Sequence, residues 1–131
     1  MKIFFVLLFP LFVFAHTFSL ASYNVYNLFD ATHQGSEYGD FAPAKWSQKD
    51  YKRKLKRITR VLQDLDADII MLQEIENENV LLSLKKRLGY PYHAALPDNG
   101  TAITLGTLSR YEITQAKRVD VKGQKRDILK T

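Results

Sequence analysis

The stretch DIIMLQE at residues 68–74 decides how this chain folds. Its four apolar residues are consecutive, and the run ends abruptly at Gln73 and Glu74. A short continuous apolar run with polar residues on both sides is typical of a strand that is buried on both faces. We therefore predict a buried strand here, with an amide and a carboxylate side chain at its carboxyl end.

A helix is predicted directly before this strand, at residues 47–65. Ser47 suits the N-cap position, and the sequence LDAD at residues 65–68 breaks the helix. Apolar residues recur at alternating spacings of four and three, which places them on one helical face. These residues are Tyr51, Leu55, Ile58, Leu62 and Leu65. The other face is predicted to carry cations, either as a solvated surface or in contact with phosphate groups: Lys49, Lys52, Arg53, Lys54, Lys56, Arg57 and Arg60.

The elements on either side complete one α/β pattern. An extended stretch at residues 17–23 (TFSLASY) runs into Asn24, and residues 30–47 have the composition of an irregular loop. A second amphipathic helix is predicted at residues 77–88, where Gly89 terminates it. Further strands are predicted at residues 92–95, 102–108, 112–121 and 127–130. No internal repeat or linker divides the chain.

Two polar side chains are expected to meet at one edge of the sheet. A crossover helix makes the strands that it connects parallel, so both carboxyl ends lie on the same edge, where ligands collect in open α/β sheets. Asn24 ends one strand and Glu74 ends the other. Amide and carboxylate oxygens suit a hard cation such as Mg²⁺. The alternative is that Glu74 is an ordinary surface or capping residue.

The composition indicates one small folded domain with a basic net charge. The chain has 131 residues, of which 46% are hydrophobic and 25% are charged, and it contains no cysteine. Disulfide frameworks, thiolate metal sites and cysteine nucleophiles are therefore excluded. The net charge of +5 suits a polyanionic partner, either nucleic acid or an anionic membrane. A basic charge without any catalytic meaning explains the composition equally well.

The amino terminus has the pattern of a secretory signal peptide. Lys2 precedes an apolar run that ends at Ala15, and the run is too short for a spanning helix. We predict that residues 1–15 are removed and that the protein is exported, to the periplasm or beyond the cell. An uncleaved amino-terminal anchor is the alternative.

Two segments carry a resemblance to a known family. The sequence ASYNVYNLFD at residues 21–30 resembles the opening motif of the endonuclease/exonuclease/phosphatase superfamily, and DIIMLQEIEN at residues 68–77 is similar to its second motif. Residues 100–113 resemble the middle hairpin of the family, and residues 126–129 resemble the start of the next strand. The resemblance covers nearly all of the mature chain. The part of the family domain that it matches is the amino-terminal half of deoxyribonuclease-like and apurinic-endonuclease-like domains.

The resemblance implies a fold, a reaction and a cofactor. The implied fold is an α/β two-sheet sandwich with flanking helices, in four layers. The implied reaction is hydrolysis of phosphodiesters or phosphomonoesters with Mg²⁺ or Mn²⁺. Asn24 and Glu74 become metal ligands by this resemblance, while Asn27 and Gln73 flank them and are either supporting or structural residues.

The chain also departs from the family pattern. The second half of family domains carries a histidine, a Gly-Asp-x-Asn motif and a Ser-Asp-His motif, and none of these occurs here. His16, His33 and His93 stand outside any matching context and are expected to be ordinary loop or surface residues. We therefore assign no catalytic residue. Residues 16–131 are expected to be the amino-terminal part of such a domain, truncated, with one inner face of the sandwich uncovered.

Three functions follow as expectations. The leading one is an exported endonuclease or exonuclease that acts on nucleic acid, with incomplete catalytic machinery in these residues. The alternatives are a secreted phosphodiesterase for phospholipids or sugar phosphates, and an inactive fragment that binds a cation or polyanion without turnover. No stable protein partner is predicted.

Overall fold

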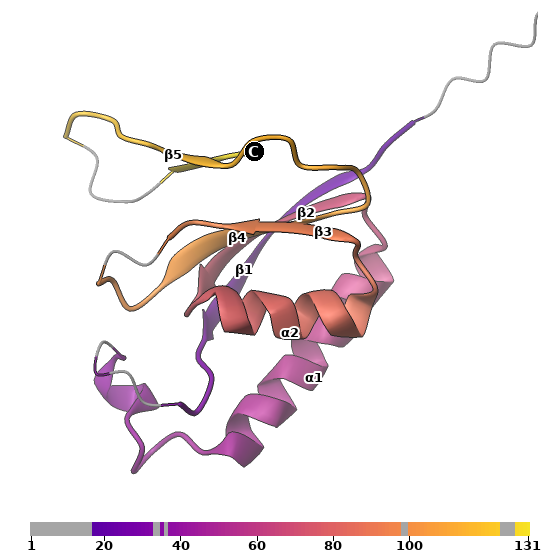
Figure 1. Ribbon diagram of the computed structural model, residues 1–131. Helices are drawn as coiled ribbons and strands as arrows, with labels where there is room; N and C mark the ends of the chain where they lie inside the picture. Colours follow the sequence, from indigo (N-terminus) through magenta and orange to yellow (C-terminus); the bar gives the residue numbers. More distant parts are fainter. Residues whose placement is uncertain (1–16, 33–34, 36, 98–99, 124–127) are drawn as a thin grey trace, which may run out of the picture.

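Two helices cover one face of a four-stranded sheet, and a two-stranded sheet lies beyond its other face (Figure 1). The structure is a computed structural model that describes residues 17–32, 35, 37–97, 100–123 and 128–131. The fold is an α/β sandwich, as the sequence predicted. Within the described residues three of the four expected layers are present, because no described helix covers the outer side of the small sheet.

The order of elements confirms the predicted β-α-β unit. The large sheet has the order β1-β2-β4-β3; β1 and β2 are parallel, whereas β4 is antiparallel to both of its neighbours. The small sheet pairs β5 with β6 in antiparallel fashion. The bounds are β1 Leu20–Leu28, the 3-10 helix η1 Gly39–Phe41, α1 Gln48–Leu65, β2 Ile69–Ile75, α2 Glu78–Leu88, β3 Tyr92–Ala95, β4 Thr104–Ser109, β5 Lys117–Val119 and β6 Ile128–Lys130.

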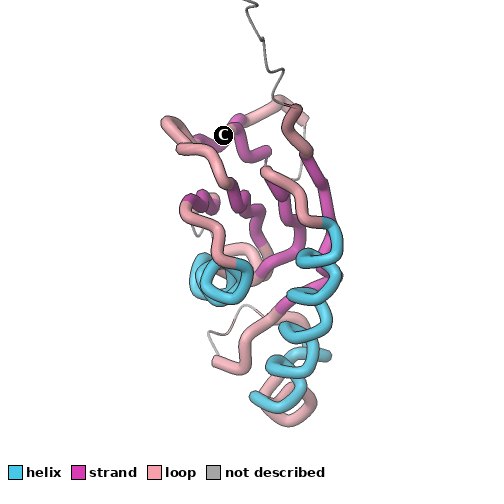
Figure 2. Tube along the Cα trace, turned by 90° about the vertical axis from the view of Figure 1, so that its right-hand side faces the viewer, coloured by secondary structure: helices cyan, strands magenta, loops and turns pink. Residues whose placement is uncertain are grey.

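Both long helices begin and end at the residues that their sequences predict. The hydroxyl of Ser47 accepts a hydrogen bond from the Asp50 N–H, and the Asp50 side chain accepts one in return from the Ser47 backbone, so α1 has a capping box. At the start of α2 the Asn77 side chain accepts a hydrogen bond from the Val80 N–H. Gly89 ends α2 in the left-handed conformation, with φ 76°. Figure 2 shows α2 nearly end-on and α1 from the side, so the two helices cross rather than run parallel.

The core lies between the large sheet and the helices. Ile70, Leu72 and Ile75 of β2 are fully buried against apolar side chains of α1 and α2. Ile69 and Met71, on the opposite face of the strand, are only half-buried. The prediction of burial on both faces was therefore wrong for one face, because that face borders a cavity between the two sheets.

Two predicted strands have different bounds in the structure. The expected strand at residues 17–23 begins later and continues past Asn24, as β1 Leu20–Leu28. The expected strand at residues 112–121 is reduced to β5 Lys117–Val119, because β6 offers it a partner over only three described residues. The predicted strand at residues 102–108 is confirmed, with a shift to Thr104–Ser109.

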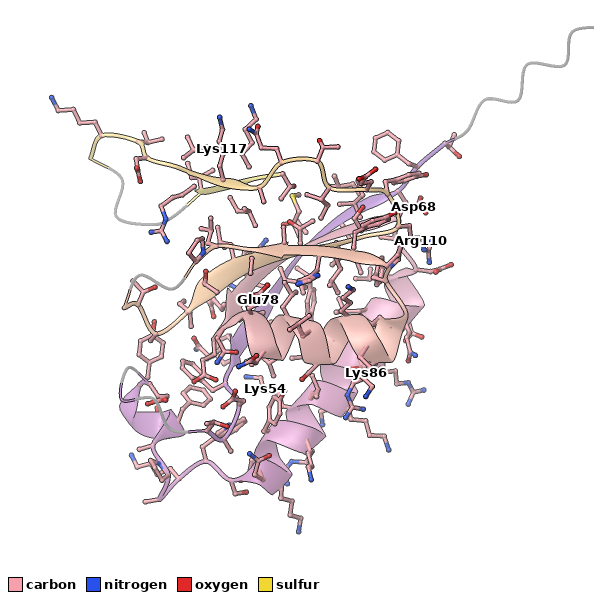
Figure 3. All side chains as sticks on the ribbon, viewed as in Figure 1. Lys54, Asp68, Glu78, Lys86, Arg110 and Lys117 are labelled. Carbon is pink, nitrogen blue, oxygen red and sulfur yellow. The ribbon has the colours of Figure 1, made fainter. Side chains whose placement is uncertain are left out.

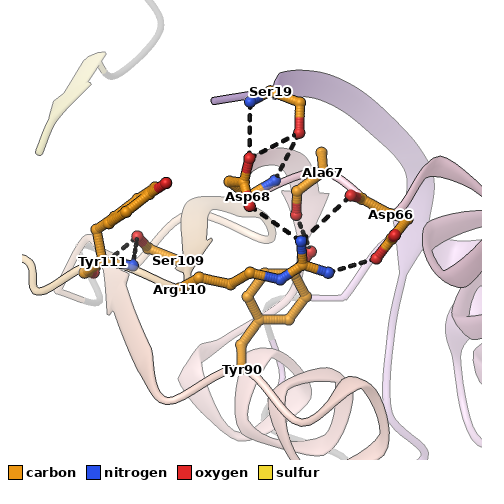
Figure 4. Close-up of polar contacts among 8 residues, drawn as sticks. All are labelled: Ser19, Asp66, Ala67, Asp68, Tyr90, Ser109, Arg110 and Tyr111. Carbon is orange, nitrogen blue, oxygen red and sulfur yellow. Dashed lines mark hydrogen bonds and ion pairs between the residues drawn. The ribbon is translucent and has the colours of Figure 1, made fainter. Parts of the chain in front are cut away.

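The carboxylate of Asp68 connects the strands at the amino edge of the β1–β2 pair by hydrogen bonds. Asp68 Oδ2 accepts hydrogen bonds from the Ser19 N–H at 2.8 Å and from the Ser19 hydroxyl at 3.0 Å (Figure 4). The guanidinium of Arg110, which follows β4, donates to Asp68 Oδ1 at 3.0 Å and also pairs with Asp66. The Cζ atom of this guanidinium lies 5.7 Å from the centroid of the Tyr90 ring. These contacts connect the starts of β1 and β2 with the end of β4.

Candidate functional site

Asn24 and Glu74 meet at the carboxyl edge of the parallel strands, as predicted. The Asn24 Nδ2 donates to Glu74 Oε1 at 2.9 Å. The residues do not follow their strands, however, but lie within them, at the point where regular pairing between β1 and β2 is interrupted. The register passes from Asn24 opposite Gln73 to Leu28 opposite Ile75, so β1 bulges between the two positions.

Residues of the bulge and of the facing part of β2 have an uncommon backbone conformation. Tyr26, Asn27 and Glu74 have φ of 54°, 60° and 63°, all in the left-handed region that favours glycine. Such a conformation costs a residue with a side chain about 1–2 kcal/mol. The strain coincides with the site, where observed backbone outliers tend to cluster.

The backbone of this bulge holds the two candidate ligands in place. The Tyr26 N–H donates to Asn24 Oδ1 at 2.7 Å, and the Asn27 N–H donates to Glu74 Oε2 at 3.1 Å. Both Glu74 oxygens and the Asn24 amide are thus oriented by described neighbours. Asn27 supports the site through its backbone, whereas the Gln73 side chain donates to Ser22 Oγ at 3.0 Å and lines the adjacent cavity.

Lys54 reaches the same bulge from α1. Its Nζ donates to the carbonyl oxygen of Tyr26 and, at 2.8 Å, to that of Asn27. Burial lowers the pKa of the Lys54 ammonium, and the nearby Glu74 carboxylate opposes that shift. The prediction that all cations of α1 share a solvated face was therefore wrong for Lys54. It follows Tyr51 by three residues and precedes Ile58 by four, a spacing that places it at the border of the apolar face.

An aromatic cluster surrounds the Lys54 ammonium. The centroids of Tyr26, Phe41 and Trp46 lie 5.6–5.8 Å from Nζ, within the range of cation–π attraction. Phe41 stacks on the buried Phe29 ring at 4.4 Å, and the Trp46 indole donates to the Phe29 carbonyl at 3.0 Å. Phe41 and Trp46 of the predicted loop between β1 and α1 thus pack together with Phe29. Figure 3 labels Lys54 beside α1, on the side that faces this loop.

A second carboxylate near the site is buried. Glu76 is 6% exposed, and its Oε2 accepts a hydrogen bond from the Asp30 N–H at 2.6 Å. Its Oε1 has no hydrogen-bond partner among the described residues. Burial raises the pKa of Glu76 to about 7, and the carboxylates of Asp30 and Glu37 add to that shift while the bond from the Asp30 N–H opposes it.

A cavity of about 580 Å³ opens beside Asn24 and Glu74. It lies between the inner face of the large sheet and β6, so the inner face is only partly covered by the small sheet. Its lining mixes polar side chains, among them Asn24, Glu74 and three threonines, with the apolar side chains of Met71, Ile103, Leu105, Ile128 and Leu129. This volume and mixed lining are typical of sites for small ligands or for part of a larger substrate.

Asn24 and Glu74, which line this cavity, fit a hard cation with a partly open shell. The Glu74 carboxylate and the Asn24 amide oxygen each retain lone pairs beyond the hydrogen bonds that they accept. No group of three or more His, Cys, Asp and Glu residues that could hold a metal ion occurs within the part of the chain that the structure describes. Mg²⁺ can bind at a site with a single carboxylate such as Glu74, since it is often held by one or two protein carboxylates together with water and substrate phosphate.

The histidines are not brought to this site. His93 in β3 pairs with Glu78 of α2 at 3.1 Å, on the helix side of the sheet. His16 and His33 lie outside the described residues. Sequence reasoning missed Lys54 and Glu76; the helical spacing of Lys54 was an available signal, whereas nothing local marks Glu76 as buried.

In α/β sheets ligands collect outside the carboxyl ends of the strands, and an amide–carboxylate pair at that edge offers the oxygen atoms that hard cations prefer. The sequence model of the endonuclease/exonuclease/phosphatase family matches residues 19–125, and the chain therefore belongs to that family. No curated protein and no solved structure matches it. Membership supports a function of the phosphodiester hydrolase type, in a family that generally uses divalent metals and acts on nucleic acid or phospholipid substrates.

Proposed function

We propose that this chain provides the metal-binding part of an exported phosphodiester hydrolase that acts on nucleic acid. The observation that supports it most is the pairing of Asn24 with Glu74 at 2.9 Å beside the cavity of about 580 Å³. Glu74 would hold Mg²⁺ or Mn²⁺, with Asn24 as the second ligand. When bound, the cation neutralises charge on a phosphoryl oxygen and activates water or a leaving group.

The protein's own groups would position the substrate. The N–H groups of Tyr26 and Asn27 hold the ligand oxygens, so the amide and carboxylate are oriented before a phosphate arrives. The net charge of +5 favours encounter with a polyanion. The apolar part of the cavity would exclude water from one side of the substrate.

Binding of a metal ion tests the site directly. In a calorimetric titration with Mn²⁺, Glu74→Gln should weaken the affinity at least about tenfold, because the variant loses the only charge among the two ligands. Glu78→Gln serves as a matched control, since Glu78 is an exposed carboxylate paired with His93, and its affinity should stay within about twofold of wild type. Equal affinities for Glu74→Gln and wild type would refute the metal site.

The substrate class is tested by binding with and without the metal. A fluorescent single-stranded oligonucleotide should bind more tightly when Mg²⁺ is present, and this increment should vanish in Glu74→Gln. Vesicles of phosphatidylcholine with phosphatidylglycerol form the second arm. If Mg²⁺ increases the affinity for the vesicles and not for the oligonucleotide, phospholipid would replace nucleic acid as the substrate class.

Export is a separate part of the proposal. The pattern at residues 1–15 supports it, and these residues lie outside the described part of the chain. No helix in the described segments has the length and apolar character needed to cross a membrane. Amino-terminal sequencing of protein recovered outside the cytoplasm should begin at His16; a sequence that still begins at Met1 would contradict cleavage.

A further inference from the structure

We propose that Lys54 is a positioning residue that sets the metal-binding geometry of Glu74 through a single peptide group. The inference rests on the proposed function, because it concerns the same candidate site. It is carried by the contacts of the peptide between Tyr26 and Asn27. The carbonyl of this peptide accepts a hydrogen bond from Lys54 Nζ, and its N–H donates to Glu74 Oε2 at 3.1 Å.

The two hydrogen bonds depend on each other. A peptide group is planar, with its carbonyl and N–H on opposite sides, so one orientation satisfies both Lys54 and Glu74. Rotation of the plane would remove the ammonium from the carbonyl and the N–H from the carboxylate together. An ammonium on the carbonyl also polarises the amide and strengthens the bond that its N–H donates. Lys54 therefore acts on Glu74 without contacting it.

The strained backbone explains why such an anchor is needed. Tyr26 and Asn27 are both left-handed although neither is glycine. The Lys54 ammonium also donates a hydrogen bond to the Asn27 carbonyl oxygen at 2.8 Å, so it holds two successive carbonyls of the strained segment. A conformation of this kind persists only where its surroundings determine it.

Lys54 differs in placement from every other cation of its helix. It is half-buried, within reach of three aromatic rings, whereas its six basic neighbours in α1 are exposed. Burial of an ammonium without a carboxylate partner is costly, and the carbonyls and ring faces compensate for the lost water. A surface lysine held only for solubility would not be placed in this way.

The sign of the effect on metal affinity separates positioning from simple electrostatics. Lys54→Met keeps much of the apolar stem and removes the ammonium. Removal of a positive charge near a cation site would by itself tighten Mn²⁺ binding, since like charges repel. Positioning predicts the reverse: Lys54→Met should weaken Mn²⁺ binding at least about tenfold in a calorimetric titration. Lys56→Met, which removes an exposed charge from the same helix, should stay within about twofold of wild type.

A second readout does not depend on the metal. In ¹⁵N-resolved NMR spectra, the Asn27 amide of Lys54→Met should shift upfield and exchange with solvent at least about tenfold faster, because its bond to Glu74 is lost. Lys54→Arg, which keeps the charge and the donors, should restore most of both the amide signal and the Mn²⁺ affinity. Thermal unfolding establishes that each variant is folded. If Lys54→Met is not, Lys54→Gln is measured instead, with the same expectations.

The outcomes are distinguishable. An unchanged Asn27 amide in the folded variant, or Mn²⁺ binding that is unchanged or tighter, overturns the role of Lys54. Absence of Mn²⁺ binding in the wild type refutes the proposed function, and the amide measurement then still decides whether Lys54 holds the peptide against Glu74.

Discussion

At the scale of the residue, the candidate site depends on side chains placed where their intrinsic preferences disfavour them. Tyr26, Asn27 and Glu74 occupy left-handed backbone, and Glu76 is a buried carboxylate with one oxygen lacking a described partner. Each of these features costs stability, and each lies at or beside the meeting point of β1 and β2. Proteins retain such costs mainly where a function requires the geometry.

Glu76 makes a pH-dependent contribution to stability whose sign is opposite to that of a carboxylate whose pKa is lowered by folding. Its pKa is about 7 in the folded chain against a reference value of 4.5, so the folded state binds more protons between those values. The free energy of unfolding should therefore fall as pH rises from about 4.5 to about 7, and remain lowered above that range. Below pH 4.5 the Glu76 carboxyl is protonated in both the folded and the unfolded state, so it no longer makes the free energy of unfolding depend on pH.

We expect Glu76→Gln to abolish this fall. At pH 8 the variant should be more stable than wild type by about 1–2 kcal/mol, a figure reduced for solvent screening. Urea unfolding at pH 5 and at pH 8 measures it, with the exposed Glu112→Gln as control. A variant that is less stable than wild type at pH 8 would show that the charged form of Glu76 is favoured in the fold.

At the scale of the element, α2 approaches the sheet closely because β4 has a glycine beneath it. Gly106 is buried within β4, and a Cβ built there would lie 2.7 Å from Ile75 Cδ1 and 2.9 Å from Leu81 Cδ2. Ile75 and Leu81 are themselves fully buried and have little room to move. The absence of a side chain at this position therefore sets the distance between helix and sheet.

Gly106→Ala should destabilise the chain by about 1–3 kcal/mol, the usual cost of adding a methyl group to a well-packed core. Thermal or urea unfolding measures the effect. Gly39→Ala is the matched control, since its Cβ would meet nothing within 4 Å, and the substitution should be neutral or slightly stabilising. Equal stabilities of the two variants would mean that α2 shifts freely on the sheet.

At the scale of the whole molecule, the two edges of the parallel strand pair carry different features. The carboxyl edge carries the strained candidate site, and the amino edge is fastened by Asp68 to Ser19 and Arg110 (Figure 4). The Ser19 N–H and the Arg110 guanidinium hold the pKa of Asp68 below its usual range. Stability from this carboxylate is present above its unfolded pKa and is lost as pH falls through the lowered folded value.

Asp68→Asn should therefore be less stable than wild type at pH 7, and the difference should shrink in acid as wild-type Asp68 becomes protonated. Melting temperatures from pH 7 to pH 2 measure this trend. Asp64→Asn, a change to an exposed carboxylate of α1, should show no comparable trend. A difference between Asp68→Asn and wild type that is constant with pH would contradict the role of the Asp68 charge.

By itself the sequence determined the β-α-β unit, the Ser47 cap of α1 and the Gly89 terminator of α2, the family, and the meeting of Asn24 with Glu74. These follow from periodicity, capping residues and the geometry of a crossover, all of which act over a few neighbouring residues or one connection. Only the tertiary structure decided the left-handed bulge at Tyr26 and Asn27, and the inward turn of Lys54. These features arise because segments 27 to 50 residues apart in sequence supply one another's hydrogen bonds, and no local pattern records which partner a backbone group will find.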